Sequence, residues 1–437
     1  MNMAQNKNLK SLSGIVSLSP SDQILFNKIK NKIKETYELF GFEPTDTPII
    51  ERSSILLAKI SPDTEKEIYR FQKGNNDLAL RFDLTVPFAK YVVSSKNDIN
   101  FPFRRYEIGK SFRGERPQKG RFREFYQCDA DIISKNELSF LNDAEVINLI
   151  YKTFINIDLK EKFIIKINNR KILLGFLKNI TEKTSDVLLI IDKLNKISKK
   201  DAKDELKKLN IKTTDIDKIF NFIDLSKSNN IIENLRTFSV NNSLMQDGVE
   251  ELSTVISYLK DLKLPENYYK IDLSIVRGLD YYTGTVFETF FLNNEKIGSI
   301  ASGGRYEDLC SLYGKEKYPG VGMSIGLNRL FSALKDLNLL EKIKYTIPKV
   351  LILPMDKSKI SYSLNLLSKL REEGINTFVF ENEKNLKNKL EYANKIKVPY
   401  IVIIGENEEN NNNYTLKNMD TGEQFVLSLD KLIKKLL

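Results

Sequence analysis

The stretch RGERPQKGRFREFYQCDAD at residues 113–131 decides how this chain can fold. Segments of alternating character flank a loop with Gly114, Pro117 and Gly120, which predicts a strand, a loop and a second strand. The stretch also holds four arginines and one lysine. A planar guanidinium forms paired hydrogen bonds with phosphate or carboxylate, so the pattern predicts a hairpin that binds an anion. A solvated basic hairpin is the alternative.

Composition narrows the class of protein. A chain of 437 residues is long enough for two or three domains, and a hydrophobic fraction of 41% is ordinary for a globular protein. The net charge of +10 fits a polyanionic partner such as nucleic acid, although lysine-rich codon usage explains it as well. With only Cys128 and Cys310, neither a disulfide scaffold nor a cysteine zinc site is expected. No apolar run approaches a membrane span and no signal peptide is evident, so we expect a cytoplasmic protein without membrane association.

The chain contains no histidine. This absence excludes a Ser-His-Asp triad, an imidazole general base and a histidine-ligated metal. Any catalysis must depend on Arg, Lys, Asp, Glu, Tyr, backbone groups or a metal ion that the substrate carries. We therefore predict no metal site built by the protein itself.

Residues 1–170 and 265–340 are predicted to form a sheet with flanking helices. Ser19 and Pro20 are typical of a helix start, apolar residues then recur at helical spacing, and Gly41 ends the run. Residues around Pro44 and Pro48 are expected to be extended. Alternating patterns predict strands at residues 78–82, 271–276 and 283–291.

Two further segments differ from the rest of the chain in composition and hydrophobic pattern. Residues 171–264 combine apolar residues at helical spacing with many lysines and few glycines, which predicts a mostly helical insertion. In residues 348–437, strand-like runs at 350–353, 377–380 and 400–404 alternate with amphipathic stretches such as 363–371, which predicts a small α/β domain. The polar run at 406–413 is expected to be a surface turn.

Three other segments carry candidate chemistry. Asp83 and Thr85 are expected to end a strand on one face, where they can accept hydrogen bonds from an ammonium group; a helix N-cap is the alternative. In the run RGLDYYTGTVFE at 277–288, Arg277 can contact a phosphate and two tyrosines can form a wall, unless the run is a hairpin with core tyrosines. In the run GVGMSIGLNRL, Arg329 lies near a helix start that favours anions. None of these segments has Walker or Rossmann spacing.

These segments, with LRFDLT and SGGRY, occur in an order that resembles the histidyl-tRNA synthetases, and RGLDYYTGTVFE is specific to that family. The resemblance covers essentially the whole chain. It implies an α+β catalytic domain of the class II synthetases (an antiparallel sheet flanked by helices), a helical insertion and a C-terminal α/β anticodon-binding domain. It also implies a homodimer that forms through the first class II motif, here residues 42–48.

The reaction implied by the resemblance uses ATP with Mg²⁺ and no prosthetic group. Histidine attacks the α-phosphate to give histidyl-adenylate, and the acyl group then passes to the 3′ end of tRNA(His). The partners are thus L-histidine, ATP and tRNA(His), and no DNA is expected.

The same resemblance implies roles for residues. Arg113 and Arg277 would contact the α-phosphate and act in catalysis, and the other ATP-binding residues would be Glu115, Arg121, Phe125 and Arg329. Gln127 would help to hold the carboxylate end of histidine. The other histidine-binding residues would be Asp83, Leu84 and Thr85 at the α-ammonium, Asp131, Tyr281 and Tyr282 at the imidazole, and Arg113 and Arg277. Arg116 and Gln118 would approach the acceptor end of tRNA.

Two alternatives remain open from the sequence. A catalytically inactive paralogue, such as the regulatory subunit of ATP phosphoribosyltransferase in histidine biosynthesis, usually lacks the C-terminal domain and the catalytic arginines. This chain keeps Arg113, Arg277, Arg329 and residues 348–437. A simple RNA-binding module explains the net charge but not the convergence of acidic and tyrosine residues.

Overall fold

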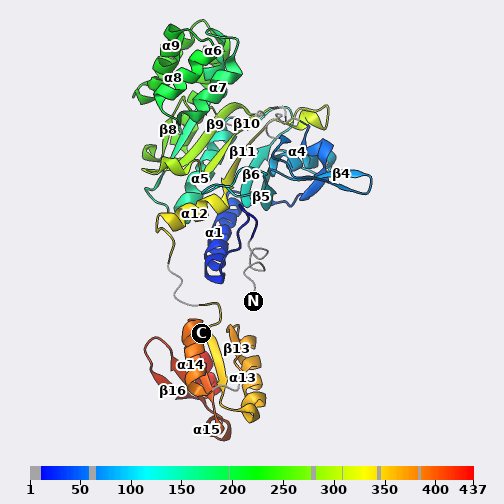
Figure 1. Ribbon diagram of the computed structural model, residues 1–437, viewed down its shortest axis with the longest axis vertical. Coiled ribbons are helices and arrows are strands. Elements are labelled where there is room, and N and C mark those ends of the chain that lie inside the picture. Colours follow the sequence, from blue (N-terminus) through cyan, green and yellow to red (C-terminus); the bar gives the residue numbers. More distant parts are fainter. Residues whose placement is uncertain are drawn as a thin grey trace, which may run out of the picture. The chain divides into compact units, whose positions relative to one another are not determined.

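The computed structural model describes residues 11–58, 65–195, 197–276, 282–307, 309–341, 346–381 and 385–437. The chain forms two compact units. One comprises Met1–Leu18 and Phe26–Leu339, and the other comprises Ser19–Leu25 and Leu340–Leu437. Figure 1 shows the two units along the chain.

An eight-stranded sheet forms the centre of the larger unit, in the order β1-β5-β6-β11-β10-β9-β7-β8. Only the pairs at its two edges, β1 with β5 and β7 with β8, are parallel. The predicted antiparallel sheet is therefore confirmed. Its strands are β1 (Glu43–Pro44), β5 (Phe103–Phe112), β6 (Glu124–Ile133), β7 (Phe163–Asn169), β8 (Tyr269–Ile271), β9 (Tyr282–Phe291), β10 (Ala301–Tyr306) and β11 (Gly320–Gly326).

Helices cover one face of this sheet. On α1 (Pro20–Leu39), the hydroxyl of Tyr37 donates to the Cys128 carbonyl, 3.0 Å away. On α5 (Leu141–Asn156), the carboxylate of Asp143 binds the Arg305 guanidinium of β10, with an N–O distance of 2.6 Å. Residues of α12 (Leu327–Asp336) pack beside α1, where the rings of Phe26 and Phe331 meet edge to face. Odd- and even-numbered residues of a strand point to opposite faces of the sheet. On β6 and β11, every second side chain therefore points to the face that these helices do not cover.

The start and end of α1 follow the predicted signals. The hydroxyl of Ser19 accepts from the backbone N–H of Asp22 at 3.2 Å, which caps the first turn. After the helix, Gly41 has a φ of +75°, a conformation that favours glycine.

Two strand predictions extended past the observed strand ends. The predicted strand at 78–82 overlaps β4 (Asn76–Leu80), which pairs with β2 (Ile50–Arg52) and β3 (Arg70–Lys73) in a small sheet. The predicted strand at 271–276 ends with β8 at Ile271. There the Asp272 carboxylate accepts from the Ser274 backbone N–H at 3.1 Å, and this local turn competes with strand pairing.

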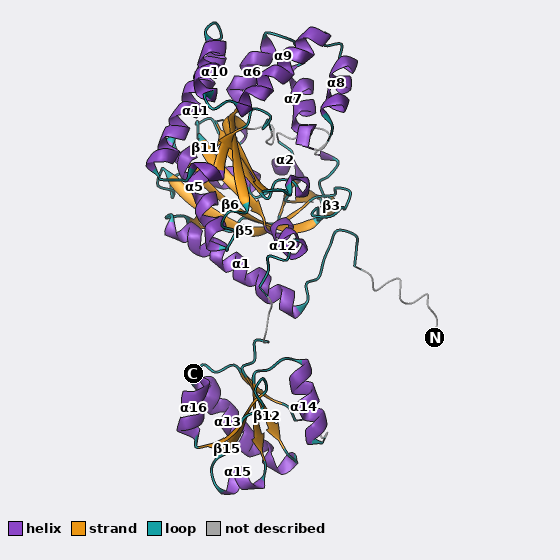
Figure 2. Ribbon diagram, turned by 90° about the vertical axis from the view of Figure 1, so that its left-hand side faces the viewer, coloured by secondary structure: helices purple, strands orange, loops and turns teal. Residues whose placement is uncertain are grey.

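The mostly helical texture predicted for residues 171–264 is confirmed, and Figure 2 shows these helices together beyond the sheet. The Ser198 and Asp201 side chains form a capping box at the start of α8. The helices are α6 (Arg170–Lys178), α7 (Thr184–Asp192), α8 (Lys199–Lys208), α9 (Thr213–Asp224), α10 (Ile231–Ser239) and α11 (Ser243–Asp261).

The smaller unit has the α/β architecture expected for residues 348–437. Its sheet has the order β13-β12-β14-β15-β16, and β12 is parallel to both of its neighbours. The polar run expected as a surface turn instead begins with a short helix, α15 (Glu406–Asn410), because the Glu408 carboxylate accepts from the Gly405 N–H at 2.8 Å. The other elements are β12 (Val350–Pro354), β13 (Thr377–Val379), β14 (Tyr400–Ile404), β15 (Tyr414–Asn418), β16 (Gln424–Leu427), α13 (Ile360–Glu372), α14 (Leu386–Lys395) and α16 (Leu429–Leu436).

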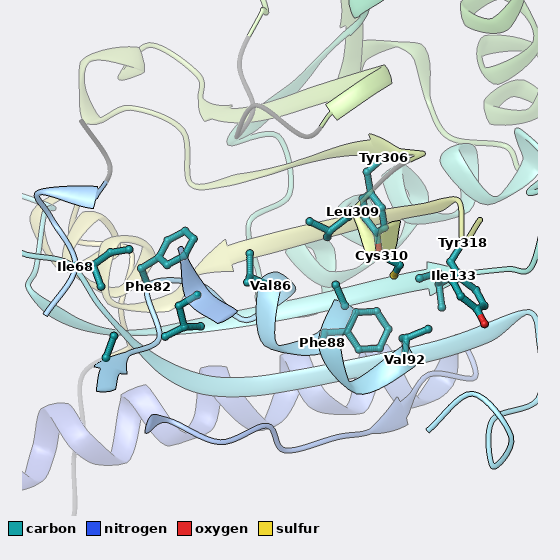
Figure 3. Close-up of a cluster of buried hydrophobic side chains, with 13 residues drawn as sticks. Ile68, Phe82, Val86, Phe88, Val92, Ile133, Tyr306, Leu309, Cys310 and Tyr318 are labelled. Carbon is teal, nitrogen blue, oxygen red and sulfur yellow. The ribbon is translucent and has the colours of Figure 1, made fainter. Parts of the chain in front are cut away.

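A hydrophobic cluster anchors the helix α4 (Thr85–Ser94) beside the large sheet, as Figure 3 shows. Phe88 and Val92 of α4 pack in it with Ile133 at the end of β6 and Tyr306 of β10. All four side chains are fully buried. The cluster thus fixes the start of α4 next to the last residues of β6.

Candidate active site

The predicted hairpin at 113–131 is confirmed by the pairing of β5 with β6. In this register Glu107 lies opposite Asp129, and Arg105 lies opposite Asp131. Because directly opposed residues share a face, these side chains and Gln127 point to the face away from Cys128. We call this side of the large sheet the site face.

The loop of the hairpin is held by its own charges. The Glu115 carboxylate accepts from Arg121 Nη1 at 3.0 Å, and its Oε1 lies 3.8 Å from Arg113 Nη1. Arg123 Nε donates to the Glu115 carbonyl at 3.1 Å. One carboxylate therefore sets the distance between two of the predicted phosphate-binding arginines, whereas Arg116 and Gln118 are exposed on the loop.

Arg113 lies between the hairpin and the start of α4. Its Nε donates to the Phe82 carbonyl at 3.1 Å, and its guanidinium lies 5.2 Å from the centre of the Phe125 ring. About a third of the side chain is exposed, so its outer N–H groups are accessible to an anion. Predicted residues from two segments of the chain are thus brought together here.

Arg329 and Arg121 line one cavity of about 350 Å³, to which Glu288 and Lys296 also contribute. Arg329 Nε donates to the Gly120 carbonyl at 3.0 Å, and its Nη1 donates to the Ser299 carbonyl at 2.9 Å. Arg329 therefore ties the tip of the hairpin to the start of α12. The cavity is large enough for the phosphates of a nucleotide. Its two guanidiniums supply positive charge for binding these phosphates.

Asp131 is the anchor of a buried network. Its Oδ2 lies 2.7 Å from Arg105 Nη2, and its Oδ1 accepts from the Tyr306 hydroxyl at 3.1 Å. Arg105 also donates to the Leu84 carbonyl at 3.2 Å and lies over the Phe88 ring. Burial raises the pKa of Asp131, while the Arg105 charge and the Tyr306 hydroxyl act in the opposite direction.

A second buried pair lies behind the first. Arg81 Nη1 is 2.6 Å from Glu107 Oε1, and the Thr47 hydroxyl donates to the same carboxylate. Both charged side chains are 1% exposed. The sequence analysis missed Arg81, Arg105, Glu107 and Tyr306; the alternation of charged and apolar residues before the hairpin was the available signal.

The prediction that Asp83 and Thr85 end a strand was wrong: a helix begins here, and its N-cap residue is Leu84, which lies between them. Thr85 is the first residue of α4, and the Asp83 carboxylate accepts from the backbone N–H of Val86 at 3.0 Å. The free N–H groups of a first helical turn favour such an acceptor over strand pairing. Burial raises the pKa of Asp83 to about 6, against the effects of the Val86 N–H, Arg113 and Arg105.

Gln127 and Asp129 lie beside Ser324 of β11 on the site face. Gln127 Nε2 donates to the Ser324 hydroxyl at 3.0 Å. Asp129, directly opposite Ser324, is 1% exposed. Burial raises the pKa of Asp129 to about 8, the Arg105 charge opposes this shift and the Asp131 charge adds to it.

Tyr282 begins β9 opposite Tyr306 of β10 and packs against the cluster around α4. It is therefore next to Tyr306, whose hydroxyl donates to Asp131. Arg277 and Tyr281 lie outside the described residues. In the described part of the chain no group of acidic or cysteine side chains is arranged to hold a metal ion, and no helix is long and apolar enough to cross a membrane.

Comparison with known proteins gives matches along almost the whole chain. The family model "Histidyl-tRNA synthetase" matches residues 14–330, and the model "Anticodon binding domain" matches residues 349–437. A histidine–tRNA ligase of Clostridium tetani is 48% identical, with 97% of each chain covered. A histidine–tRNA ligase of Finegoldia magna is 44% identical, with 98% of this chain and 99% of the relative covered.

Solved structures agree with these matches. The crystal structure of histidyl-tRNA synthetase from Nostoc sp. PCC 7120 has a TM-score of 0.86 at 36% identity and covers 98% of this chain and 100% of its own. An ATP phosphoribosyltransferase regulatory subunit/histidyl-tRNA synthetase from Bacillus halodurans has a TM-score of 0.74 at 20% identity, covering 90% of this chain and 98% of its own. At that identity the second match shows a common fold only.

Proposed function

The chain belongs to the histidyl-tRNA synthetase family, and we propose how its residues carry out the reaction of a histidine–tRNA ligase. The enzyme activates L-histidine with ATP and transfers the histidyl group to tRNA(His). One observation supports this most strongly: Arg113, beside Phe125 of the hairpin, is bonded to the loop that carries the buried carboxylate of Asp83. A group for the α-phosphate and a group for an amino acid are thus adjacent.

The regulatory-subunit alternative is disfavoured. The chain retains Arg113 and Arg329, and the anticodon-binding family model covers residues 349–437. The relatives that match it end to end are named ligases.

For ATP, we assign the α-phosphate to Arg113 and Arg277 and the γ-phosphate to Arg121 and Arg329. ATP brings its own Mg²⁺, as a substrate complex. When the histidine carboxylate attacks, negative charge develops on the α-phosphoryl oxygens, and cations fixed in advance stabilise it. Glu115 and Phe125 would hold the adenine. A carboxylate has about four lone-pair positions, so the Arg121 hydrogen bond to Glu115 leaves room for the adenine amino group.

For histidine, the imidazole is assigned to Asp131, Tyr281 and Tyr282, and the α-ammonium to the segment Asp83, Leu84 and Thr85. Arg105 and Tyr306 hold Asp131 in place, which gives the imidazole a fixed acceptor. A site that pairs both ring nitrogens rejects analogues that leave its own polar groups unpaired.

For tRNA, the exposed Arg116 and Gln118 would reach the acceptor end, and the C-terminal domain would read the anticodon. We divide the chain into a catalytic core (1–170 and 265–340), a helical insertion (171–264) that contacts the acceptor stem, and the anticodon-binding domain (348–437). A homodimer is supported by the half-exposed apolar side chains of Ile49, Ile50 and Phe71 near the first class II motif. We place the enzyme in the cytoplasm, with no membrane or DNA partner.

Histidine-dependent exchange of pyrophosphate into ATP tests this proposal, followed by charging of tRNA(His). Wild-type protein is expected to support both reactions, and Arg113→Ala is expected to lower the exchange rate about a hundred- to a thousandfold. No exchange by folded wild-type protein would contradict the proposed function.

A further inference from the structure

Apart from Asp131 Oδ2, which lies 2.7 Å from Arg105 Nη2, three buried oxygens at the site accept no hydrogen bond from the residues that the structure describes: Asp83 Oδ2, Gln127 Oε1 and Asp129 Oδ1. Each of these residues is less than one-tenth exposed. A buried acceptor without a donor is costly, so native proteins rarely keep one without a reason such as a bound ligand. Three such oxygens in one region indicate a ligand with several N–H groups.

The three residues are neighbours. Gln127 and Asp129 are two apart on β6 and point to the same face. Ser324 joins them, since it accepts from Gln127 Nε2 at 3.0 Å, lies directly opposite Asp129 and lowers the pKa of the Asp129 carboxyl. The Asp83 charge is close enough to Asp129 to raise its pKa.

The Gln127 amide presents its nitrogen to Ser324. Its Nε2 donates to the Ser324 hydroxyl at 3.0 Å, and an amide nitrogen only donates. This leaves Gln127 Oε1, an acceptor, for the ligand. We had expected Gln127 to hold the carboxylate end of histidine, for which a donor is needed.

The ion pairs at the site also favour a cationic ligand. Arg81 pairs with Glu107, and Arg105 pairs with Asp131. Asp83 and Asp129 have no ion pair within 4.0 Å among the described residues. A buried carboxylate without a cation of its own favours a ligand that supplies one.

We infer that Asp129 is a further binding residue for the α-ammonium group of histidine, which it contacts together with Asp83 and Gln127. The inference rests on the proposed function. An ammonium group has three N–H donors, and these residues offer three acceptor oxygens. Asp129 is not among the residues to which the family resemblance gives a role, and Ser324 acts as a positioning residue for both neighbours.

Bound histidine would keep Asp129 and Asp83 ionised, so its binding should release protons between pH 6 and 8. The groups that face Asp129 are Arg105 and Glu107 from β5, Asp131 from its own strand, Asp83 from the loop before α4, and, through its charge interaction from the helical side, Tyr37. A raised carboxyl pKa means that lower pH protonates these groups. The KM for histidine is therefore expected to rise as the pH falls from 8 to 6, and to rise less in a variant that lacks the Asp129 charge.

The variant Asp129→Asn tests the contact. It should raise the KM for histidine about ten- to hundredfold, because charge-assisted hydrogen bonds are lost, and leave the KM for ATP within about twofold. Two analogues locate the effect: histidinol keeps the ammonium but lacks the carboxylate, and imidazolepropionate lacks the ammonium. The variant should weaken histidinol binding and leave imidazolepropionate binding unchanged. Since the chain has no histidine, the imidazole NMR signals come from the analogue alone.

Stability separates a binding role from a structural one. At pH above about 8, where Asp129 is ionised in the folded protein, Asp129→Asn removes a buried charge that has no ion-pair partner among the described residues, so it should melt at or above the wild-type temperature. The matched control is Asp143→Asn, a buried carboxylate that Arg305 already pairs, and it should melt lower. If Asp129→Asn does not fold, calorimetry of the wild type in buffers of different ionisation enthalpy remains: histidinol should release more protons than imidazolepropionate at pH 7.

Three results would overturn the inference. These are an unchanged KM for histidine in folded Asp129→Asn, equal weakening of both analogues, and equal proton release by both analogues. In each case wild-type exchange is intact, whereas loss of wild-type exchange would reject the proposed function itself.

Discussion

Gly322 of β11 is predicted to be essential because its missing side chain makes room for Asp131. A Cβ at this position would lie 1.9 Å from Asp131 Oδ1 and 2.7 Å from its Cγ. The carboxylate cannot move aside freely, since Arg105 and Tyr306 hold it and it is buried. In Gly322→Ala it must therefore break at least one of these contacts.

The size of the effect follows from those contacts. Overpacking of a buried site typically costs about 1–3 kcal/mol of unfolding free energy. A complete break from Arg105 would leave this buried guanidinium with the more distant Glu107, 3.6 Å away, as its ion-pair partner, and would raise the cost up to about 3–5 kcal/mol. If Asp131 also loses the hydrogen bond that we propose it makes to the imidazole, about 1.5–3 kcal/mol of histidine binding is lost, so the KM for histidine should rise at least tenfold.

Thermal melts and pyrophosphate exchange measure the two effects. The control is a double-mutant cycle with Asp131→Ala, which removes the atoms that the new methyl group meets. In that background Gly322→Ala should cost little further stability. An undiminished cost in the double variant, or a histidine KM within about twofold of wild type in Gly322→Ala, would refute the reasoning.

Three further predictions concern charge. Arg113→Lys should lower the exchange rate about a hundredfold with an unchanged melting temperature, because an ammonium cannot replace the guanidinium fork at the α-phosphate; single-turnover exchange measures this. Arg121→Ala, which removes one guanidinium from the cavity, should raise the KM for ATP and not that for histidine, and equal effects on both would contradict its proposed role at the γ-phosphate. Burial raises the pKa values of Asp83 and Asp129 to about 6 and about 8, so the folded protein binds more protons than the unfolded chain between about pH 4 and 8. The ligand-free protein should therefore melt at a lower temperature at pH 8 than at pH 6, and a steeper rather than flatter slope in Asp129→Asn would contradict this.

Local signals in the sequence were sufficient for much of the fold. The helix α1 begins and ends where capping chemistry acts over three or four residues, and the hairpin at 113–131 is closed by its own loop. At Asp83 two local signals competed. Alternation favoured a strand, but the Asp83 carboxylate accepts a hydrogen bond from the Val86 N–H at the start of α4.

The contacts that hold the site residues in place could not be predicted from local signals. Arg105 and Asp131 are 26 residues apart in sequence, and Tyr306 meets Asp131 across 175 residues. Alternation shows that a residue faces one side of a strand, but it does not give the register between strands. Ser324 acquires its place only because β11 pairs with β6, opposite Asp129. The sequence shows a glycine at 322, but the need for a glycine there comes from the side chain of Asp131, which is distant in sequence.

Because the chain has no histidine, these buried carboxylates are important for its titration near neutral pH. In most chains an imidazole titrates between pH 6 and 8, whereas in the described part of this chain burial raises the pKa values of two carboxyl groups, Asp83 and Asp129, to about 6 and about 8. Asp83 and Asp129 have no ion-pair partner among the described residues, so an amino acid with an α-ammonium group would offset the cost of burying these carboxylates. An imidazole compound without that ammonium relieves none of it. Selection for a whole amino acid, and not only for an imidazole ring, is thereby built into the same sheet face that holds Asp131.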